Sequence, residues 1–134
     1  MLKPVIAAAV ILLAALPAMA QQDCPDDSQA GLNQCAGDAY KKADAALNAA
    51  YKQVMARLKD SEAAAKSLVT AQRAWIAYRD AECDFMSSGV EGGSARPMVV
   101  AQCLEQLTTQ RADDLKALLS CEEGDLSCPV PAAE

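Results

Sequence analysis

The run from Ala71 to Cys83, AQRAWIAYRDAEC, constrains the fold more than any other part of this sequence. It contains the only tryptophan, Trp75, together with Arg79 and Cys83, which follow at intervals of four residues. On a helix of 3.6 residues per turn these side chains share one face with Leu68, Gln72 and Met86. A helix with an aromatic ring, a guanidinium and a thiol on its inner face must pack against polar as well as apolar partners.

The rest of the chain also has helical periodicity and lacks the alternation typical of strands. Apolar residues recur at helical spacing over residues 32–58 and again over residues 100–118. A break at residues 59–61 and a glycine-rich stretch at residues 89–94 separate the periodic segments, because closely spaced glycines disfavour a helix. The sequence therefore predicts an all-α protein, an antiparallel up-down-up bundle of three long helices stapled by disulfides.

Residues 1–20 have the features of a secretory signal peptide. Lys3 provides a basic start, residues 5–16 an apolar segment, and Ala18-Met19-Ala20 a cleavage site with small residues. The apolar segment is too short to cross a bilayer, and no later segment approaches the roughly 20 apolar residues that a spanning helix needs. We therefore expect cleavage after Ala20 and a periplasmic or secreted protein with no membrane span.

Cleavage would leave one small domain at residues 21–121 and an acidic, proline-containing tail at residues 122–134. The whole sequence has 12 basic and 18 acidic residues, and removing Lys3 leaves 11 − 18, a net charge of −7. This charge disfavours nucleic acid and anionic lipid surfaces as partners and favours a basic protein, although it also serves solubility. The oligomeric state is left open.

All six cysteines follow the expected cleavage site, and an even number in a small exported chain indicates disulfides. An antiparallel bundle places four of them at one pole: Cys24, Cys35, Cys83 and Cys103. Cys121 is about 27 Å further along the third helix than Cys103, so its reachable partner is Cys128. We favour Cys83–Cys103, which would close the glycine-rich loop, together with Cys24–Cys35. A cross pairing through Cys35 stays open.

Charged residues fall on the inner stripes of the predicted helices. Arg79 and Arg111 lie on two of these stripes, and Asp44 lies near the inner face of the first helix. Because a buried, unpaired charge is costly, we expect Asp44 or Asp80 to pair with one or both arginines in a structural polar network. The alternative is a small pocket for a polar ligand, lined by Trp75, Tyr78, Arg79 and Arg111.

Several kinds of chemistry are disfavoured by what the sequence lacks. It contains no histidine and no C-x-x-C pair, which argues against a metal site, a haem or a thioredoxin-like centre. It has no G-x-S-x-G motif, and its acidic pairs lie in the terminal segments or on a helix flank. We therefore expect no cofactor, no metal and no catalytic residues.

Four motifs in order resemble a known family. They are ADAALNAAY from Ala43, AQRAWIAYRDAEC from Ala71, EGGS from Glu91 and CLEQLTTQR from Cys103. Together they resemble the LprI-type lysozyme inhibitor domain of bacterial envelope proteins, over nearly all of the chain after the expected cleavage site. The resemblance implies a small, helical, exported and disulfide-bonded protein, and for at least some members inhibition of lysozyme.

The function implied is inhibition of lysozyme-type muramidases by occlusion of the enzyme cleft. C-type lysozymes are basic, so they would attract an acidic inhibitor, and they hold two carboxylates in the cleft. The expected target-binding loop contains Gly92, Gly93, Ser94 and Arg96, with Arg96 directed to those carboxylates. In the structural alternative the glycines only reverse the chain and Ser94 caps the third helix. A second hypothesis is a non-catalytic envelope module that binds another protein or a small ligand.

Overall fold

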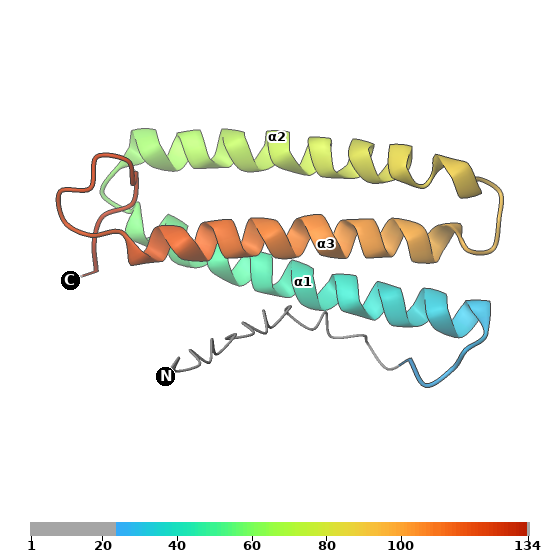
Figure 1. Ribbon diagram of the computed structural model, residues 1–134. Coiled ribbons are helices and arrows are strands. Elements are labelled where there is room, and N and C mark those ends of the chain that lie inside the picture. Colours follow the sequence, from blue (N-terminus) through green and yellow to red (C-terminus); the bar gives the residue numbers. More distant parts are fainter. Residues whose placement is uncertain (1–23, 134) are drawn as a thin grey trace, which may run out of the picture.

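Three long helices form the protein, and no strand is present in the part that the structure describes (Figure 1). The computed structural model describes residues 24–133, with α1 at Gln29–Arg57, α2 at Glu62–Met86 and α3 at Arg96–Ala117. Short 3-10 turns follow α2 at Ser88–Val90 and α3 at Leu118–Ser120. The predicted all-α, up-down-up arrangement is confirmed. The expected signal peptide and its cleavage site lie outside the described residues.

None of the helices in the described part of the chain is long and apolar enough to cross a membrane.

The first helix, α1, begins at a well-defined cap. The hydroxyl of Ser28 accepts a hydrogen bond from the Gly31 amide at 3.1 Å, and the Asp26 carboxylate accepts one from the Ser28 amide at 2.8 Å. These bonds satisfy amides that have no partner inside the helix, and so they fix where α1 starts.

The tightest packing in the molecule is between α1 and α3. The buried face of α1 is rich in alanine and consists of Ala36, Ala39, Ala43, Leu47, Ala50 and Val54. The buried face of α3 is similarly small and consists of Ala101, Thr108, Ala112 and Leu115. Small side chains allow two helix backbones to approach closely, and the larger leucines and Val54 fill the space at one end of the pair.

The second helix is attached to this pair mainly by polar contacts. Its fully buried residues are Gln72, Arg79 and Cys83, and no aliphatic side chain of α2 is buried to the same degree. Leu68 and Trp75 are half-buried against the core. In Figure 1, α2 forms one edge of the bundle, so a large part of its surface faces away from the other helices.

The C-terminal segment is part of the core rather than a separate tail. Val130 is only 4% exposed and packs with Leu58 and Leu115. Arg57, at the end of α1, donates hydrogen bonds to the carbonyl oxygens of Leu119 at 2.9 Å and Pro131 at 3.2 Å. The sequence assigned no packing role to these residues; the structure shows that they close the apolar end of the bundle.

Three disulfides hold the chain at both ends. Cys24 pairs with Cys35, Cys83 with Cys103, and Cys121 with Cys128, with Cα–Cα separations of 5.8, 5.5 and 5.9 Å. These separations lie within the usual range for disulfides. The described part of the chain has no free cysteine, and the pairs fit an extracellular, oxidising location.

Candidate functional site

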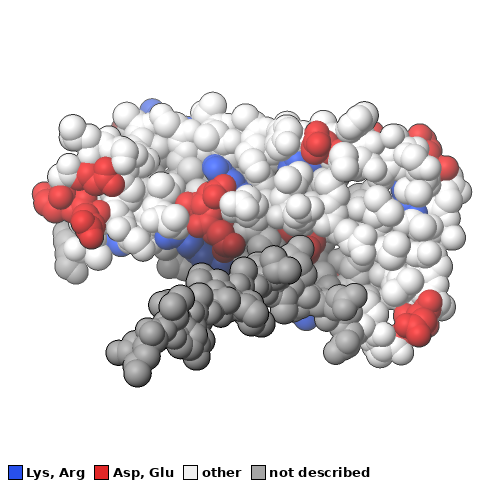
Figure 2. All heavy atoms as spheres, viewed as in Figure 1, with Lys and Arg blue, Asp and Glu red and all other residues white. Residues whose placement is uncertain are grey.

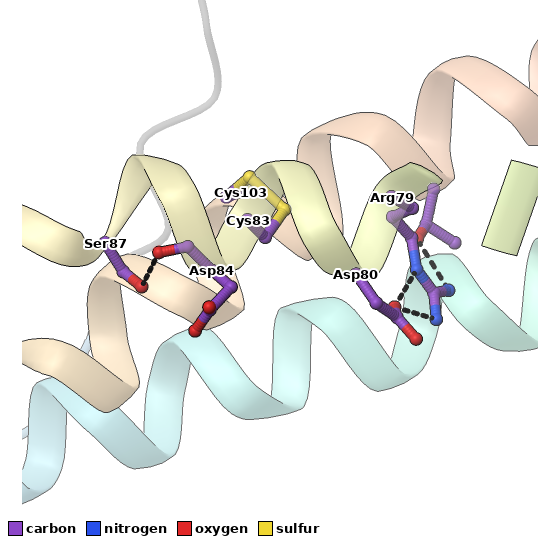
Figure 3. The surroundings of a disulfide bond; sticks show 7 residues. Arg79, Asp80, Cys83, Asp84, Ser87 and Cys103 are labelled. Carbon is purple, nitrogen blue, oxygen red and sulfur yellow. Dashed lines mark hydrogen bonds and ion pairs between the residues drawn. A yellow bond between two sulfur atoms is a disulfide. The ribbon is translucent and has the colours of Figure 1, made fainter. Parts of the chain in front are cut away.

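The loop between α2 and α3, residues 87–95, forms one end of the bundle. It starts at Ser87, which is fully buried and donates a hydrogen bond from its hydroxyl to the Asp84 carbonyl at 3.1 Å (Figure 3). A series of tight turns follows, closed by bonds from the Gly93 amide to the Val90 carbonyl at 3.0 Å and from the Arg96 amide to the Gly93 carbonyl at 3.2 Å. Four exposed residues form what we call the loop tip: Glu91, Gly92, Gly93 and Ser94.

One glycine in the loop tip is required by the backbone. Gly92 has φ +74°, in the left-handed region that residues with a side chain rarely adopt. A side chain at Gly93 would approach the Val90 carbonyl oxygen to 3.2 Å, which is a tight contact. These two glycines therefore allow the chain to reverse within a few residues.

Contacts from all three helices support the loop. Cys83 of α2, which is 1% exposed, is linked to Cys103 of α3 at the base of the loop (Figure 3). On the α1 side, the Asn33 side-chain amide donates a hydrogen bond to the Ser94 carbonyl at 3.0 Å. The loop tip is thus a short exposed segment on a cross-linked support, which limits the conformational entropy that it would lose on binding a partner.

Arg96 lies at the first turn of α3 and contacts α2. Its Nη2 is 2.6 Å from Oδ1 of Asp84, and its buried Nε has no hydrogen-bond partner. The residue that precedes the helix is Ala95, and no side chain caps α3. Ser94 therefore does not act as the cap of α3, as the structural alternative required. Asp84 was not singled out from the sequence, although its position next to Cys83 places it at the base of the loop.

A polar layer joins α2 to the other two helices. The guanidinium carbon of Arg79 lies 5.2 Å from the Trp75 ring centroid and 5.6 Å from that of Tyr40. The guanidinium carbon of Arg111 lies 5.9 Å from the Trp75 ring centroid. The Nε of Arg111 donates a hydrogen bond to Oε1 of Gln72 at 3.0 Å. Such contacts allow a nearly buried cation to be stabilised without a fully buried carboxylate.

The two candidate carboxylates for this layer behave differently. Asp80 accepts hydrogen bonds from Nε and Nη2 of the adjacent Arg79 at 2.9 and 2.8 Å (Figure 3). Asp44 instead accepts a hydrogen bond from Asn48 at 3.0 Å. Thr108 of α3, which the sequence did not indicate, lies with its hydroxyl oxygen 3.5 Å from Nη1 of Arg79.

The structure brings Trp75, Arg79 and Arg111 together but not Tyr78, which is 55% exposed. A shallow hollow lies beside Arg79, between it and the base of the loop. It is lined by Tyr40, Arg79, Asp80, Cys83, Asp84, Arg96, Val100 and Leu104. The arginines and aspartates of this hollow already pair with each other, Arg79 with Asp80 and Arg96 with Asp84.

Within residues 24–133, no group of three or more histidine, cysteine, aspartate or glutamate side chains is arranged so that it could hold a metal ion. None of the carboxylates with a lowered pKa belongs to the loop tip. Hydrogen bonds from Ser28 lower the pKa of Asp26, and those from Ser127 lower the pKa of Asp125. For Asp38, hydrogen bonds from Gln34 and then Lys41 lower the pKa. These groups stabilise local structure rather than a site.

The fold and the loop define a class of small, disulfide-linked helical domains that present a short supported loop at one end. The chain matches the family model described as "Lysozyme inhibitor LprI" over residues 20–115, and it belongs to this family. It is also 39% identical over 132 residues to an uncharacterized protein of Rhizobium meliloti (strain 1021), covering 87% of this chain and 95% of that protein. No solved structure matches it. The family is one of inhibitors rather than of enzymes.

Proposed function

We propose that this protein acts after export, in the periplasm or outside the cell, as an inhibitor of lysozyme-type muramidases. Membership of the LprI family and the three disulfides support this proposal. In the proposed mechanism cleavage after Ala20 releases the chain, and the loop tip enters the enzyme cleft. The single observation that carries the mechanism is the geometry of that tip: four exposed residues on a base fixed by Cys83–Cys103.

Electrostatic attraction would bring the two proteins together. After cleavage the chain would have a net charge of 11 − 18 = −7, and acidic side chains gather in several places on the face shown in Figure 2. A c-type lysozyme is basic and holds two carboxylates in its cleft, one of which acts as the general acid. Opposite net charges raise the rate of encounter, and this effect weakens as salt screens the charges.

Within the cleft, Arg96 would exchange its partner. Its present partner, Asp84, has a side chain that is 76% exposed, and ion pairs of this kind contribute only about 0–1 kcal/mol. Transfer of the guanidinium from Asp84 to a carboxylate of the enzyme would therefore cost little, and it would bring the buried Nε closer to a charged acceptor. Ser94, whose carbonyl is already bonded to Asn33, would keep its hydroxyl available to donate to the enzyme.

The test is inhibition of a c-type lysozyme, measured on a cell-wall suspension, by the oxidised exported protein at low and high salt. We expect inhibition that weakens with salt, and an inhibition constant about tenfold or more higher for Arg96→Ala and for Ser94→Ala. Lys52→Ala removes an exposed positive charge from α1 and serves as the matched control. An absence of inhibition of c-, g- and i-type lysozymes at micromolar protein would refute the proposal.

A second variant separates contact from positioning. If Arg96 contacts the enzyme, Asp84→Asn releases the guanidinium and inhibition is kept or improved, whereas Arg96→Ala weakens it. If the Arg96–Asp84 pair only holds the loop in place, both variants weaken inhibition to the same extent. The second pattern would remove Arg96 from the proposed contact surface.

A further inference from the structure

The outer face of α2 is uncharged along most of its length, although it is exposed. It consists of Ser67, Thr70, Ala71, Ala74, Ala77, Tyr78, Ala81 and Phe85. Tyr78 and Phe85 are spaced by two helical turns and are 55% and 70% exposed. Of the five large apolar side chains that are most exposed in residues 24–133, two belong to this face, Tyr78 and Phe85, whereas Ile76 and Met86 lie on other sides of α2. Neither the bundle nor the loop tip uses this face.

Charged residues follow one edge of the face in an ordered way. Glu62, Lys66 and Arg73 lie in the first half of α2, where Lys66 pairs with Glu62 at 2.6 Å, and Asp80 and Asp84 lie in the second half. Lys66, Arg73 and Asp80 are spaced by seven residues, so they lie on one side of the helix. The edge therefore has a net positive charge in the first half of α2 and a net negative charge in the second half, and the uncharged face runs beside it.

The charge pattern along this edge is complementary to the same pattern in a second copy that runs in the opposite direction. When a second α2 is placed antiparallel, with a two-fold axis passing between Trp75 and Ile76, Arg73 of each copy falls opposite Tyr78 of the other, two residues or about 3 Å along the axis from its Asp80. The same register places Lys66 opposite Phe85 of the second copy, one residue from its Asp84. A parallel arrangement in register would instead place like charges together, which is unfavourable.

The shapes of the uncharged residues agree with the same register. Ala74 falls opposite Ala77 of the second copy, and Thr70 falls opposite the second copy's Ala81, so that small side chains meet on both sides of the axis. Alanine at the centre of the contact allows two helices to approach closely, as in the α1–α3 pair of this protein.

We infer that the outer face of α2 is the interface of an antiparallel homodimer. A basic partner protein is disfavoured there because the central face carries no charge and the edge residues nearly balance, two positive against three negative. Asp80 and Asp84 are 57% and 76% exposed beside Arg79 and Arg96, so both can accept an additional cation. The two-fold axis lies near the middle of α2, so the two loop tips point in opposite directions and both stay accessible.

The test is sedimentation velocity of the oxidised exported protein over a range of concentrations from about 1 to 500 μM. Ala74→Glu and Ala81→Glu place carboxylates at the centre of the proposed interface, and Ala45→Glu places one on the exposed side of α1 as the matched control. We expect a dimer that is weakened by about tenfold or more in the two α2 variants and unchanged in the control. Circular dichroism verifies that each variant keeps its helices.

Further measurements distinguish this dimer from other uses of the face. Arg73→Glu should also weaken the dimer, because it places two acidic side chains near each other. A monomer at every concentration, or a dimer that Ala74→Glu and Ala81→Glu leave intact, would overturn the inference. So would a monomeric wild-type protein whose lysozyme inhibition is lost in Ala74→Glu, because the face would then bind the enzyme.

Discussion

The guanidinium carbon of Arg79 lies 5.2 Å from the centroid of the Trp75 ring, which is one turn earlier on the same helix. Arg79 is only 8% exposed, and its carboxylate partner Asp80 lies at the surface. The cation is therefore held by aromatic rings on its inner side and by a carboxylate on its outer side. Trp75 and Asp80 belong to α2 themselves, so they hold Arg79 in place within that helix. The contacts that attach α2 to the bundle include those of Arg79 with Tyr40 of α1 and Thr108 of α3, together with the Cys83–Cys103 disulfide.

Replacement of Arg79 tests how much of this attachment depends on the charge. We expect Arg79→Ala to lower the free energy of unfolding by about 2–4 kcal/mol, because it removes both the cation–π contacts and the volume of a buried side chain. Arg79→Met keeps most of the volume and should cost about half as much. Urea unfolding followed by circular dichroism measures both. Equal losses in the two variants would assign the whole effect to the charge.

Removal of the Cys83–Cys103 disulfide should affect stability and inhibition together. The double variant Cys83→Ala/Cys103→Ala opens a loop with a sequence separation of 20 residues, for which chain entropy gives a loss of about 3 kcal/mol. Because this bond lies at the base of the loop tip, we also expect weaker inhibition of lysozyme.

The double variant Cys121→Ala/Cys128→Ala provides the comparison. It opens a separation of seven residues at the opposite end of the bundle, with an expected loss of about 2 kcal/mol. Inhibition should be unchanged in this variant at a temperature where it is folded. A similar loss of inhibition in both double variants would show that the loop tip is not the contact surface.

The C-terminal segment should contribute to stability through Val130. Val130→Ala removes two methyl groups from a site that is 4% exposed, so we expect a loss of about 2 kcal/mol of unfolding free energy. Leu126→Ala changes a fully exposed residue of the same segment and should have no measurable effect. Equal stability of the two variants would mean that the segment does not pack on the core in solution.

Stability should fall in acid and be nearly constant around neutral pH. The pKa of Asp26 is lowered in the folded protein, so its contribution is present above the ordinary carboxyl range and is lost as the pH falls through the lowered value. The sequence has no histidine, so no side chain with an ordinary pKa titrates between about pH 5 and 8. Urea midpoints between pH 2 and 8 measure this profile, and Asp26→Asn should flatten its acid side. A steep change between pH 6 and 7 would contradict this account.

The sequence by itself determined the helices, because their boundaries depend on local features. The break at residues 59–61, the glycines of the loop tip and the periodicity of the apolar residues are all readable without knowledge of the fold. It also indicated that the inner face of α2 is polar, since Trp75, Arg79 and Cys83 follow one another at helical spacing. The motifs around them were specific enough to indicate the family.

Only the tertiary structure decided which groups meet. Arg96 pairs with Asp84, Arg111 bonds to Gln72, and Thr108 lies beside Arg79, and in each case the two residues come from different helices. Such contacts depend on the rotation of one helix about its axis relative to the next, which periodicity fixes only to within a broad stripe. The same reason explains the C-terminal segment, because Val130 has no periodic pattern of its own and is buried only where α1 and α3 leave an apolar surface uncovered.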